Sequence, residues 1–347
     1  MAGYTYLPPT LGGDYTREAA ILSEYVARKG FDNISKKHFF SAWLNRKCMK
    51  GMPGGTSYSV PVSFSNSSNF AFVARMAELK VAMDDPVTKA VFNANTLAGT
   101  VTISQEDLAD NAGVQGGVLD IMAESLASAE RSIAEALSTA LCTGDAVASA
   151  TSLNGISHLV REDPTNTVGT LPRASSGPPD YTKYQNKHTS ISDFSTELAA
   201  GGPNIIELIR SCSDGETTPN LILADETTWS NWSSQYIIQQ DLTTVDKTAA
   251  NMGFITLSWQ GIPVAWDSHV NATEGGSIGS DVGVFYVLSS DALMLAVNRN
   301  QFKSKGLSSG DFVELPGQLA LSAKMAWRGA LCLLRGAGCG VGRIEAW

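Results

Sequence analysis

Three side chains in the C-terminal half of the chain, Asp267, His269 and Ser277, are of the types that make up the catalytic triad of a serine hydrolase. They occur in one of the known chain orders for such a triad, and residues 275–279 read G-x-S-x-G. That combination would supply a nucleophile, a general base and a carboxylate that orients the base.

The spacing argues against a triad. Asp267 and His269 are two residues apart on a predicted strand, so they share one face with Cα atoms roughly 6.5–7 Å apart. A triad needs its members to converge from separate elements. Ser277 also lacks the preceding strand and the following helix of a nucleophile elbow. We interpret Gly261 to Asp267 as a turn and a buried strand that Asp267 closes, and Ser277 as part of the polar loop that follows.

Other candidate sites are equally weak. The segment GAGCGVG at residues 336–342 lacks the third glycine of a dinucleotide fingerprint and the helix that would follow it, so it predicts a bent strand end. The histidines are dispersed and none has a partner at metal-ligand spacing: His38, His158, His188 and His269. The sequence therefore predicts no catalytic, cofactor or metal site.

The five cysteines are an odd, scattered set without a C-x-x-C pair, which favours buried, reduced thiols over a disulfide framework or a zinc site. They are Cys48, Cys142, Cys212, Cys332 and Cys339.

The composition is that of a globular protein, with 43% hydrophobic and 17% charged residues among 347. No apolar run approaches the roughly 20 residues that span a bilayer, and no secretory signal is visible at the N-terminus, so we expect no membrane association. The net charge of -9 divides into +4 for residues 1–50, +4 for residues 297–347 and -17 between them. A diffuse acidic surface argues against a dedicated DNA-binding face.

The first fifty residues predict an arm with helical segments near residues 14–26 and 39–49. Residues 57–64 then alternate polar and apolar side chains, as a strand with one apolar face does, and Pro61 places that strand at an edge. We expect the return strand to begin at Phe70. A two-stranded ribbon is marginal alone, so its apolar face must pack either on its own domain or on a neighbouring subunit. The apolar residues concerned are Tyr58, Val60, Val62, Phe64, Phe70 and Phe72.

A long helix is the clearest prediction. After an alternating segment at Val101–Ile103, Ser104 opens an S-x-x-D start signal, and Gly144 ends the periodic region. A helix of about 25 residues would span about 38 Å. Its apolar face is expected to contain Leu119, Met122, Leu126, Ile133, Leu137 and Leu141.

The remainder predicts an α+β fold without the βαβ alternation of a doubly wound sheet. Residues 161–190 are rich in Pro, Gly, Ser and Thr, which indicates a contact loop or disorder. Asp225 is expected to cap a helix that follows a buried strand at residues 221–224. Further helices are predicted at residues 191–198 and 205–211, and further strands at residues 254–259, 263–266, 282–288, 293–297 and 325–334.

This order of elements resembles the major capsid proteins of tailed bacteriophages with the Hong Kong 97-type fold. Three phrases carry the resemblance over most of the chain: LNGISHLVREDPTNTVGTLPR at residues 153–173, PNLILADETTWSNWSSQY at residues 219–236, and WQGIPVAWDSHV followed by VFYVLSSDALMLAVNRNQF between residues 259 and 302. Within residues 161–190, the part SSGPPDYTKYQNKH at residues 175–188 matches the group's pattern only loosely.

The resemblance implies an N-terminal arm at 1–50, an extended β-hairpin loop at 51–103, and a spine helix with the first part of a peripheral domain at 104–199. An axial domain at 200–285 and return strands of the peripheral domain at 286–347 complete the fold. It implies a non-enzymatic protein without cofactors that self-assembles into an icosahedral head shell around double-stranded DNA.

The implied partners are further copies of the chain in hexamers and pentamers, a portal, a separate scaffolding protein and decoration proteins. The implied location is the virion capsid, assembled in the cytoplasm of a bacterial host. The extended loop would lie on an adjacent subunit, which makes the six apolar ribbon residues candidates for inter-subunit contact. Two alternatives stay open: an encapsulin-like nanocompartment shell, and a soluble serine hydrolase that uses the region around Asp267, His269 and Ser277.

Overall fold

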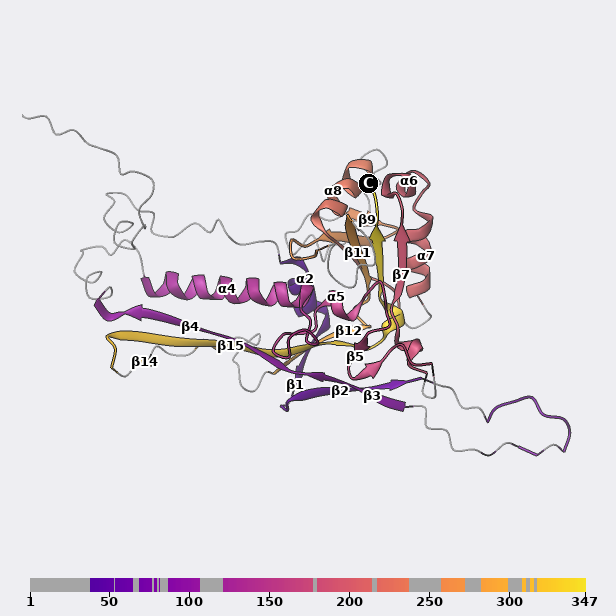
Figure 1. The fold of residues 1–347 in the computed structure, drawn as a ribbon, viewed down its shortest axis with the longest axis horizontal. Helices are drawn as coiled ribbons and strands as arrows, with labels where there is room; N and C mark the ends of the chain where they lie inside the picture. The colour runs from indigo at the N-terminus through magenta and orange to yellow at the C-terminus, as the bar shows by residue number, and fades with distance from the viewer. Residues whose placement is uncertain are drawn as a thin grey trace, which may run out of the picture. The chain divides into compact units, whose positions relative to one another are not determined.

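The computed structural model describes ten stretches of chain and several shorter ones, and the elements below all lie within them (Figure 1). The described residues are 38–52, 54–64, 69–76, 78–79, 81, 87–106, 121–176, 180–213, 217–236, 257–271, 282–298, 308–309, 313–314 and 317–347. Two compact units divide the chain. Three of the boundaries between them fall within strand β4 (Asn95–Ser104), helix α4 (Ile121–Thr143) and strand β15 (Ala320–Leu333).

The larger unit contains a mixed sheet with the strand order β7-β16-β11-β8-β10-β9. Strands β8 and β10 are parallel, as are β7 and β16, and the other neighbours are antiparallel. This pairing is an α+β arrangement without regular βαβ units, as the sequence predicts. The strands are β7 (Lys187–Ile191), β8 (Leu221–Ala224), β9 (Leu257–Trp259), β10 (Ile262–Trp266), β11 (Gly283–Leu288) and β16 (Gly340–Ile344).

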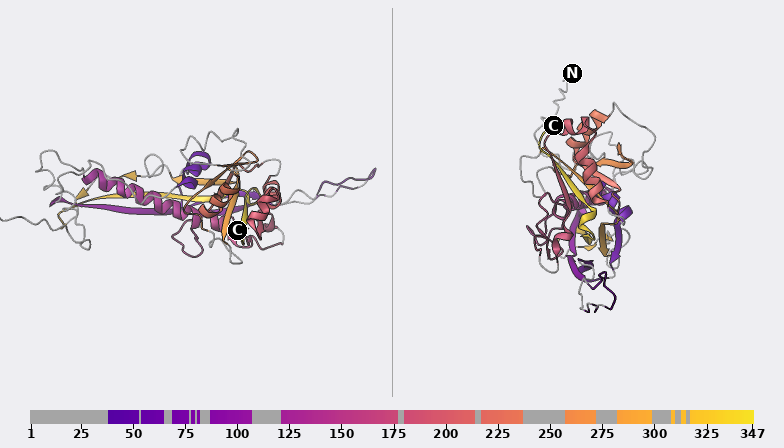
Figure 2. Two further views of the ribbon diagram at one scale, coloured as in Figure 1. Left: turned by 90° about the horizontal axis from the view of Figure 1, so that it is seen from above. Right: turned by 90° about the vertical axis from the view of Figure 1, so that its right-hand side faces the viewer.

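Both faces of this sheet are buried, which explains why its central strands are apolar without alternation. Ile222 and Phe285 point into a cluster under helices α6 (Phe194–Ala199), α7 (Pro203–Cys212) and α8 (Glu226–Tyr236), which lie together beside the sheet (Figures 1 and 2). Their neighbours Leu221 and Tyr286 point into the main core on the opposite face.

Asp225 begins α8 as predicted. Its carboxylate accepts hydrogen bonds from the backbone N–H groups of Thr227 and Thr228 at 3.0 and 3.1 Å, and another from Val284 at 2.9 Å. The side chain therefore caps the helix and joins it to β11.

Glycines in β16 allow two layers to approach closely. A Cβ atom on Gly342 would lie 2.1 Å from the ring of Phe285 on β11, and one on Gly340 would lie 2.8 Å from Cys212 on α7. The glycine-rich tail thus forms a 3-10 turn, η4 (Gly336–Gly338), followed by an interior strand of the sheet, in place of a nucleotide-binding loop.

A second sheet follows the order β1-β12-β15-β13, with β14 and β4 also paired to β15. In the larger unit, β12 (Leu293–Asn298) pairs parallel with β1 (Met49–Met52) and antiparallel with β15 (Ala320–Leu333), and β13 (Ser308–Ser309) pairs with Met325 and Ala326. In the smaller unit, β14 (Val313–Glu314) pairs with Leu321 and Ser322.

The predicted long helix is confirmed as α4 (Ile121–Thr143), followed by Gly144. Ile133, Leu137 and Leu141 are buried on its predicted face. The alternating segment before it is also confirmed, because Val101 and Ile103 are buried on β4 (Asn95–Ser104). Ser104 Oγ accepts from the N–H of Glu106, while Leu119 lies outside the described residues.

The second predicted helix of the N-terminal region consists of α2 (Phe39–Trp43) and the π-helical turn η1 (Leu44–Cys48). Phe39, Phe40, Trp43 and Leu44 are buried in the main core, so this part of the predicted arm belongs to the body of the protein. The first predicted helix, at residues 14–26, lies outside the described residues.

The ribbon has a different return strand from the one predicted. β2 (Ser57–Ser63) pairs antiparallel with β3 (Val87–Asn93), and Phe70 and Phe72 are not in a strand. The prediction was wrong because turn-forming residues after Phe64 indicated a tight turn, whereas the pairing partner lies more than twenty residues further along.

The described residues of the stretch 161–190, namely 161–176 and 180–190, contain regular elements, whereas the composition predicted a contact loop or disorder. After α5 (Ile156–Leu159) come the two-stranded pair β5 (Thr167–Val168) and β6 (Leu171–Pro172), and then the 3-10 helix η2 (Tyr181–Tyr184) and β7. The strand β7 occupies the predicted start of the helix at residues 191–198, which begins instead at Phe194. Composition indicates few regular elements here but gives no information about the buried polar contacts described below.

Candidate functional site

Asp267 and His269 are in direct contact, although they do not lie on one strand. β10 ends at Trp266, and a turn follows in which Asp267 Oδ1 accepts the backbone N–H of His269 at 3.0 Å and lies 2.8 Å from its Nδ1. Asp267 Oδ2 accepts the N–H of Phe40 at 2.8 Å. The carboxylate is fully buried. The Nδ1 side of the His269 ring therefore faces Asp267, and the Nε2 side faces away from it.

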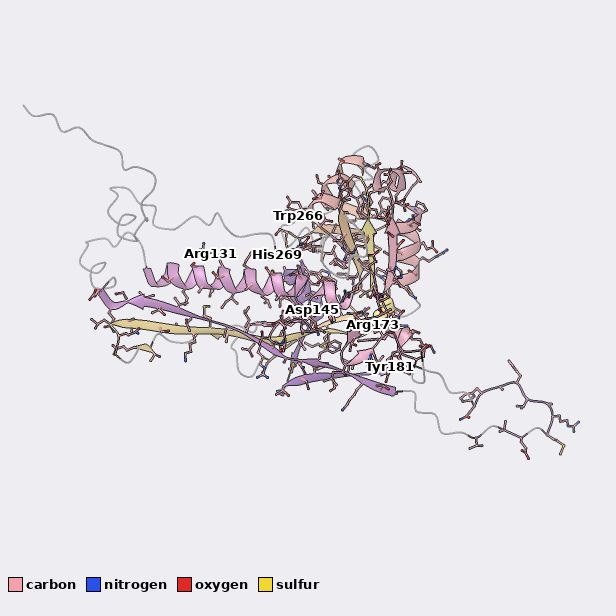
Figure 3. The ribbon with its side chains drawn as sticks, viewed as in Figure 1. Arg131, Asp145, Arg173, Tyr181, Trp266 and His269 are labelled. Atoms are coloured by element: carbon pink, nitrogen blue, oxygen red, sulfur yellow. The ribbon has the colours of Figure 1, made fainter. Side chains whose placement is uncertain are left out.

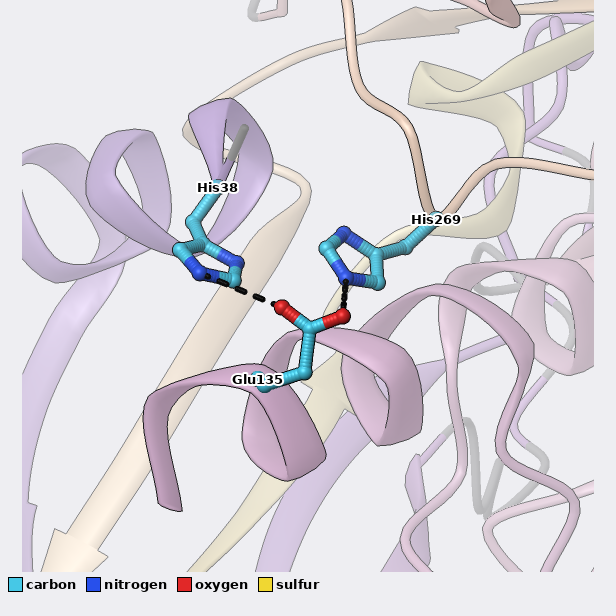
Figure 4. A group of neighbouring side chains, drawn as sticks. All are labelled: His38, Glu135 and His269. Atoms are coloured by element: carbon cyan, nitrogen blue, oxygen red, sulfur yellow. Dashed lines mark hydrogen bonds and ion pairs between the residues drawn. The ribbon is translucent and has the colours of Figure 1, made fainter. Parts of the chain in front are cut away.

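The far side of the His269 ring meets Glu135 from α4, as Figure 4 shows. His269 Nε2 lies 3.0 Å from Glu135 Oε1, and His38 Nε2 lies 3.4 Å from Oε2 of the same carboxylate. The two imidazole rings stack with centroids 5.1 Å apart and planes inclined by 16°. Three segments far apart in the chain thus converge on one carboxylate.

Burial lowers the pKa of His269, but the hydrogen bonds to Asp267 and Glu135 more than offset it, so the pKa lies above the usual value for histidine. Beside the group, Cys142 is fully buried, and burial together with the charge of Asp267 raises the pKa of its thiol well above the usual range. A histidine held between two carboxylates, with a protonated thiol beside it, is not arranged as a general base with a nucleophile.

Ser277 lies outside the described residues, so the third member of the hydrolase hypothesis has no position here. The two residues that complete the group, His38 and Glu135, were not candidates in the sequence. His38 lies 97 positions before Glu135, and Glu135 lies 134 positions before His269, so no local sequence pattern connects the three residues. The prediction that Asp267 and His269 share one strand face was wrong, because it extended the strand three residues beyond its end at Trp266.

A buried arginine, Arg173, organises the described residues of the stretch 161–190 (Figure 3). Arg173 is fully buried and donates to Leu159 O at 3.1 Å, to Asn166 O at 3.3 Å, to Asn186 Oδ1 at 3.2 Å and to Asn166 Oδ1. Burial lowers its pKa to about 10, so the guanidinium stays charged at neutral pH. Gln185 Nε2 donates to the Arg173 carbonyl at 2.7 Å. Amide and carbonyl groups, with no acidic partner among these contacts, satisfy this charge.

The six ribbon residues fall into two groups. Val60 and Phe64 are buried in the core of their own chain, and Tyr58 and Val62 are partly buried against it. Phe64 also makes edge-to-face contacts with Tyr181 and Tyr184. By contrast, Phe70 and Phe72 are 89% and 110% exposed. Other apolar side chains of the same segment are also exposed: Val73, Met76, Leu79 and Val81.

A surface hollow of about 520 Å³ lies between η2, β7 and α7. Its lining is polar and includes Lys183, Lys187, His188 and Glu207, but none of the residues around His269. It therefore does not connect the histidine group to a substrate-sized cavity.

All five cysteines are buried and none forms a disulfide bond, as predicted. Burial raises the pKa of the Cys48, Cys332 and Cys339 thiols to about 12, so these groups are unreactive as nucleophiles. No helix in the described part of the chain has the length and apolar character needed to cross a bilayer.

Comparison with family models and with curated proteins finds no match. Comparison with solved structures finds, among others, capsids of phages and of a GTA particle. The chain is similar to the capsid of cyanophage A-1(L), with 14% identity, a TM-score of 0.63, and 95% of this chain and 99% of that chain covered. It is also similar to the capsid of a native GTA particle (13% identity, TM-score 0.58, 97% and 100% covered) and to that of Myoviridae phage XM1 (11% identity, TM-score 0.56, 96% and 99% covered). The chain therefore has the α+β fold of the proteins that form these capsids, over almost its whole length and theirs.

Proposed function

We propose that this chain is a major capsid protein, which self-assembles into the icosahedral head shell that encloses the double-stranded DNA of a bacteriophage. The observation that carries the proposal is the match in fold over 95% or more of this chain and 99% or more of three capsid chains. Almost every residue of the chain thus belongs to the part that matches capsid chains. We therefore propose a structural, non-enzymatic role located in the virion capsid.

The exposed part of the ribbon supports assembly. A run of exposed apolar side chains between Phe70 and Val81 is a liability for a monomer in water, and such patches mark protein–protein contacts. We propose that Phe70 and Phe72 pack on a neighbouring copy. Tyr58, Val60, Val62 and Phe64 hold the base of the ribbon on its own core and support the contact from there.

The remaining partners follow from the same proposal. Hexamers and pentamers of the chain make the shell, and a portal, a separate scaffolding protein and decoration proteins join it during assembly in the host cytoplasm. The net charge of -9 suits a wall that encloses DNA without sequence-specific binding. Tight, salt-sensitive binding of the free subunit to duplex DNA would contradict this part of the proposal.

Particle size tests the function directly. The purified chain, alone and with its co-expressed scaffold, is examined by light scattering and negative-stain microscopy. Megadalton icosahedral particles or their capsomers are expected. A stable monomer or dimer in every condition contradicts the proposal, and labelling of Ser277 by a serine-reactive probe would support the hydrolase alternative. Particles that contain a cargo enzyme in place of DNA would support the encapsulin-like alternative.

A further inference from the structure

The group formed by His38, Glu135 and His269 has the donor set of a zinc site. Two imidazole nitrogens and one carboxylate are ligands that Zn²⁺ takes readily, and three protein ligands leave a fourth position for water. The donor atoms of the three side chains all lie within 4.8 Å of one another. The groups come from three segments, namely the residue before α2, the middle of α4 and the turn after β10.

The distances fit an ion. Two ligands at about 2.0–2.1 Å from a tetrahedral zinc lie about 3.3 Å from each other. The nitrogens of His269 and His38 lie 3.0 and 3.4 Å from the oxygens of Glu135. The three donor atoms lie within 4.8 Å of one another, so modest side-chain shifts bring them around one ion. Figure 4 shows both rings directed at the Glu135 carboxylate.

A second observation points to the same role. Asp267 holds His269 through Nδ1 at 2.8 Å, and the Asp267 carboxylate is itself fixed by the N–H of Phe40. A carboxylate behind a histidine is the usual support of a zinc ligand, because it sets the ring orientation and directs Nε2 at the metal. His38 Nδ1 is also buried without a hydrogen-bond partner among the described residues, so its ring is not held by another polar group on that side.

The charge balance favours a dication. Asp267 and Glu135 together carry two negative charges in a partly buried site, and Asp267 is fully buried. With both imidazoles neutral, as metal coordination requires, one Zn²⁺ ion neutralises the group. Access is open, because the side chains of His38 and Glu135 are 24% and 33% exposed.

We propose that His38 Nε2, Glu135 and His269 Nε2 bind one zinc ion, with Asp267 as the support of His269, and that the ion fastens the start of α2 to α4 and to the turn after β10. This proposal does not depend on the assembly of a shell. It departs from the sequence prediction of no metal site.

The test uses the full-length chain, stripped with a chelator and then titrated with Zn²⁺ alone. Wild-type protein is expected to bind one ion per chain and to melt at a higher temperature. At free zinc 100 times Kd the ratio of folded to unfolded chain rises about 100-fold. His38→Gln is expected to weaken zinc binding at least tenfold while keeping its metal-free melting temperature, because its side chain is partly exposed and makes no cap hydrogen bond. Glu135→Gln is expected to weaken binding too, and exposed His188→Gln is the matched control that keeps it.

Co²⁺ in place of Zn²⁺ identifies the ligands. Visible d–d absorption without a near-ultraviolet sulfur charge-transfer band supports nitrogen and oxygen ligands, whereas a strong charge-transfer band assigns the ion to cysteine and overturns the proposal. Absence of binding, or equal affinity in wild type, His38→Gln and Glu135→Gln, also overturns it. None of these outcomes bears on particle formation, so failure here is distinguishable from failure of the proposed function.

Discussion

Single buried polar residues carry much of the specificity of this fold. Arg173 is the clearest example, because one guanidinium joins α5, the loop at Asn166 and the segment at Asn186. A lone arginine in a proline- and glycine-rich stretch predicts nothing of this kind. Its burial becomes visible only when the carbonyl groups that surround it are in place.

Replacement of Arg173 should be strongly destabilising. Arg173→Ala leaves several buried acceptors without donors, and we expect a loss of about 3–5 kcal/mol in the free energy of unfolding. Arg173→Lys should lose less free energy of unfolding, because the ammonium group of lysine keeps the charge. The loss should not vanish, because a single ammonium group cannot reach all the acceptors that the planar guanidinium contacts. Urea denaturation of the unassembled chain measures both. Arg210→Ala, at a 79% exposed site, is the control and should change the value by no more than about 0.5 kcal/mol.

Histidine 158 should make stability fall in acid. Burial lowers its pKa, and Asp145 3.2 Å from Nδ1 only partly counteracts this. When the pKa of a histidine is lower in the folded chain than in the unfolded one, its contribution to the free energy of unfolding is fully present above the unfolded pKa of about 6.5. That contribution is lost as the pH falls from there towards the folded pKa. We expect the free energy of unfolding to drop more steeply between about pH 6.5 and 5 in wild type than in His158→Gln.

Denaturant titrations at several pH values measure the two slopes. His188→Gln, at an exposed histidine, should keep the wild-type slope. Identical slopes for wild type and His158→Gln would mean that His158 takes up its proton as easily in the folded chain as in the unfolded one.

At the scale of elements, the close packing of strands explains sequence features such as the glycine-rich tail, which resembles a nucleotide-binding motif. The glycine-rich tail is an interior strand whose glycines make room for the Phe285 ring and for α7. Two-sided burial also accounts for the continuous apolar runs of β8, β11 and β12. Periodicity and helix caps were sufficient to predict most of these elements, including α4 and α8.

Gly342→Ala should destabilise the sheet by about 1–3 kcal/mol, because its methyl group would meet the Phe285 ring at 2.1 Å. Gly99→Ala is the matched control, since no atom lies within 4 Å of the position that its methyl group would take, and it should be neutral or slightly stabilising. Thermal denaturation compares them. Phe285→Leu in the Gly342→Ala background should recover part of the loss, and a purely additive double variant would contradict the contact.

For the whole molecule, the two ends of the ribbon have different roles. Val60 is 6% exposed, so Val60→Asp would unfold the chain and would test the core of the subunit, not a contact between subunits. Phe70 and Phe72 are exposed, so their replacement tests assembly without disturbing the folding of the subunit.

Replacement of both exposed phenylalanines should impair assembly alone. Phe70→Ser with Phe72→Ser should change the free energy of unfolding of the subunit by no more than about 0.5 kcal/mol. If each ring is buried on a neighbour, its loss removes about 1.5–3 kcal/mol per contact, so the concentration at which shells form should rise at least tenfold. Light scattering against concentration measures the onset. Val147→Ser, at another exposed apolar site, is the control, and normal shells at the wild-type concentration would place the contact elsewhere.

Local patterns in the chain were enough to predict the types of most elements and their order, because hydrophobic period, capping residues and glycine stops act within a few residues of one another. They indicated the α+β fold, α4, the strand and helix joined at Asp225, and the buried thiols. The pairing of β3 with β2, the burial of Arg173 and the meeting of His38 and Glu135 with His269 became known only from the folded chain. These features depend on contacts between residues from 7 to 134 positions apart, at separations that follow no fixed period, so they leave no periodic trace in a single sequence.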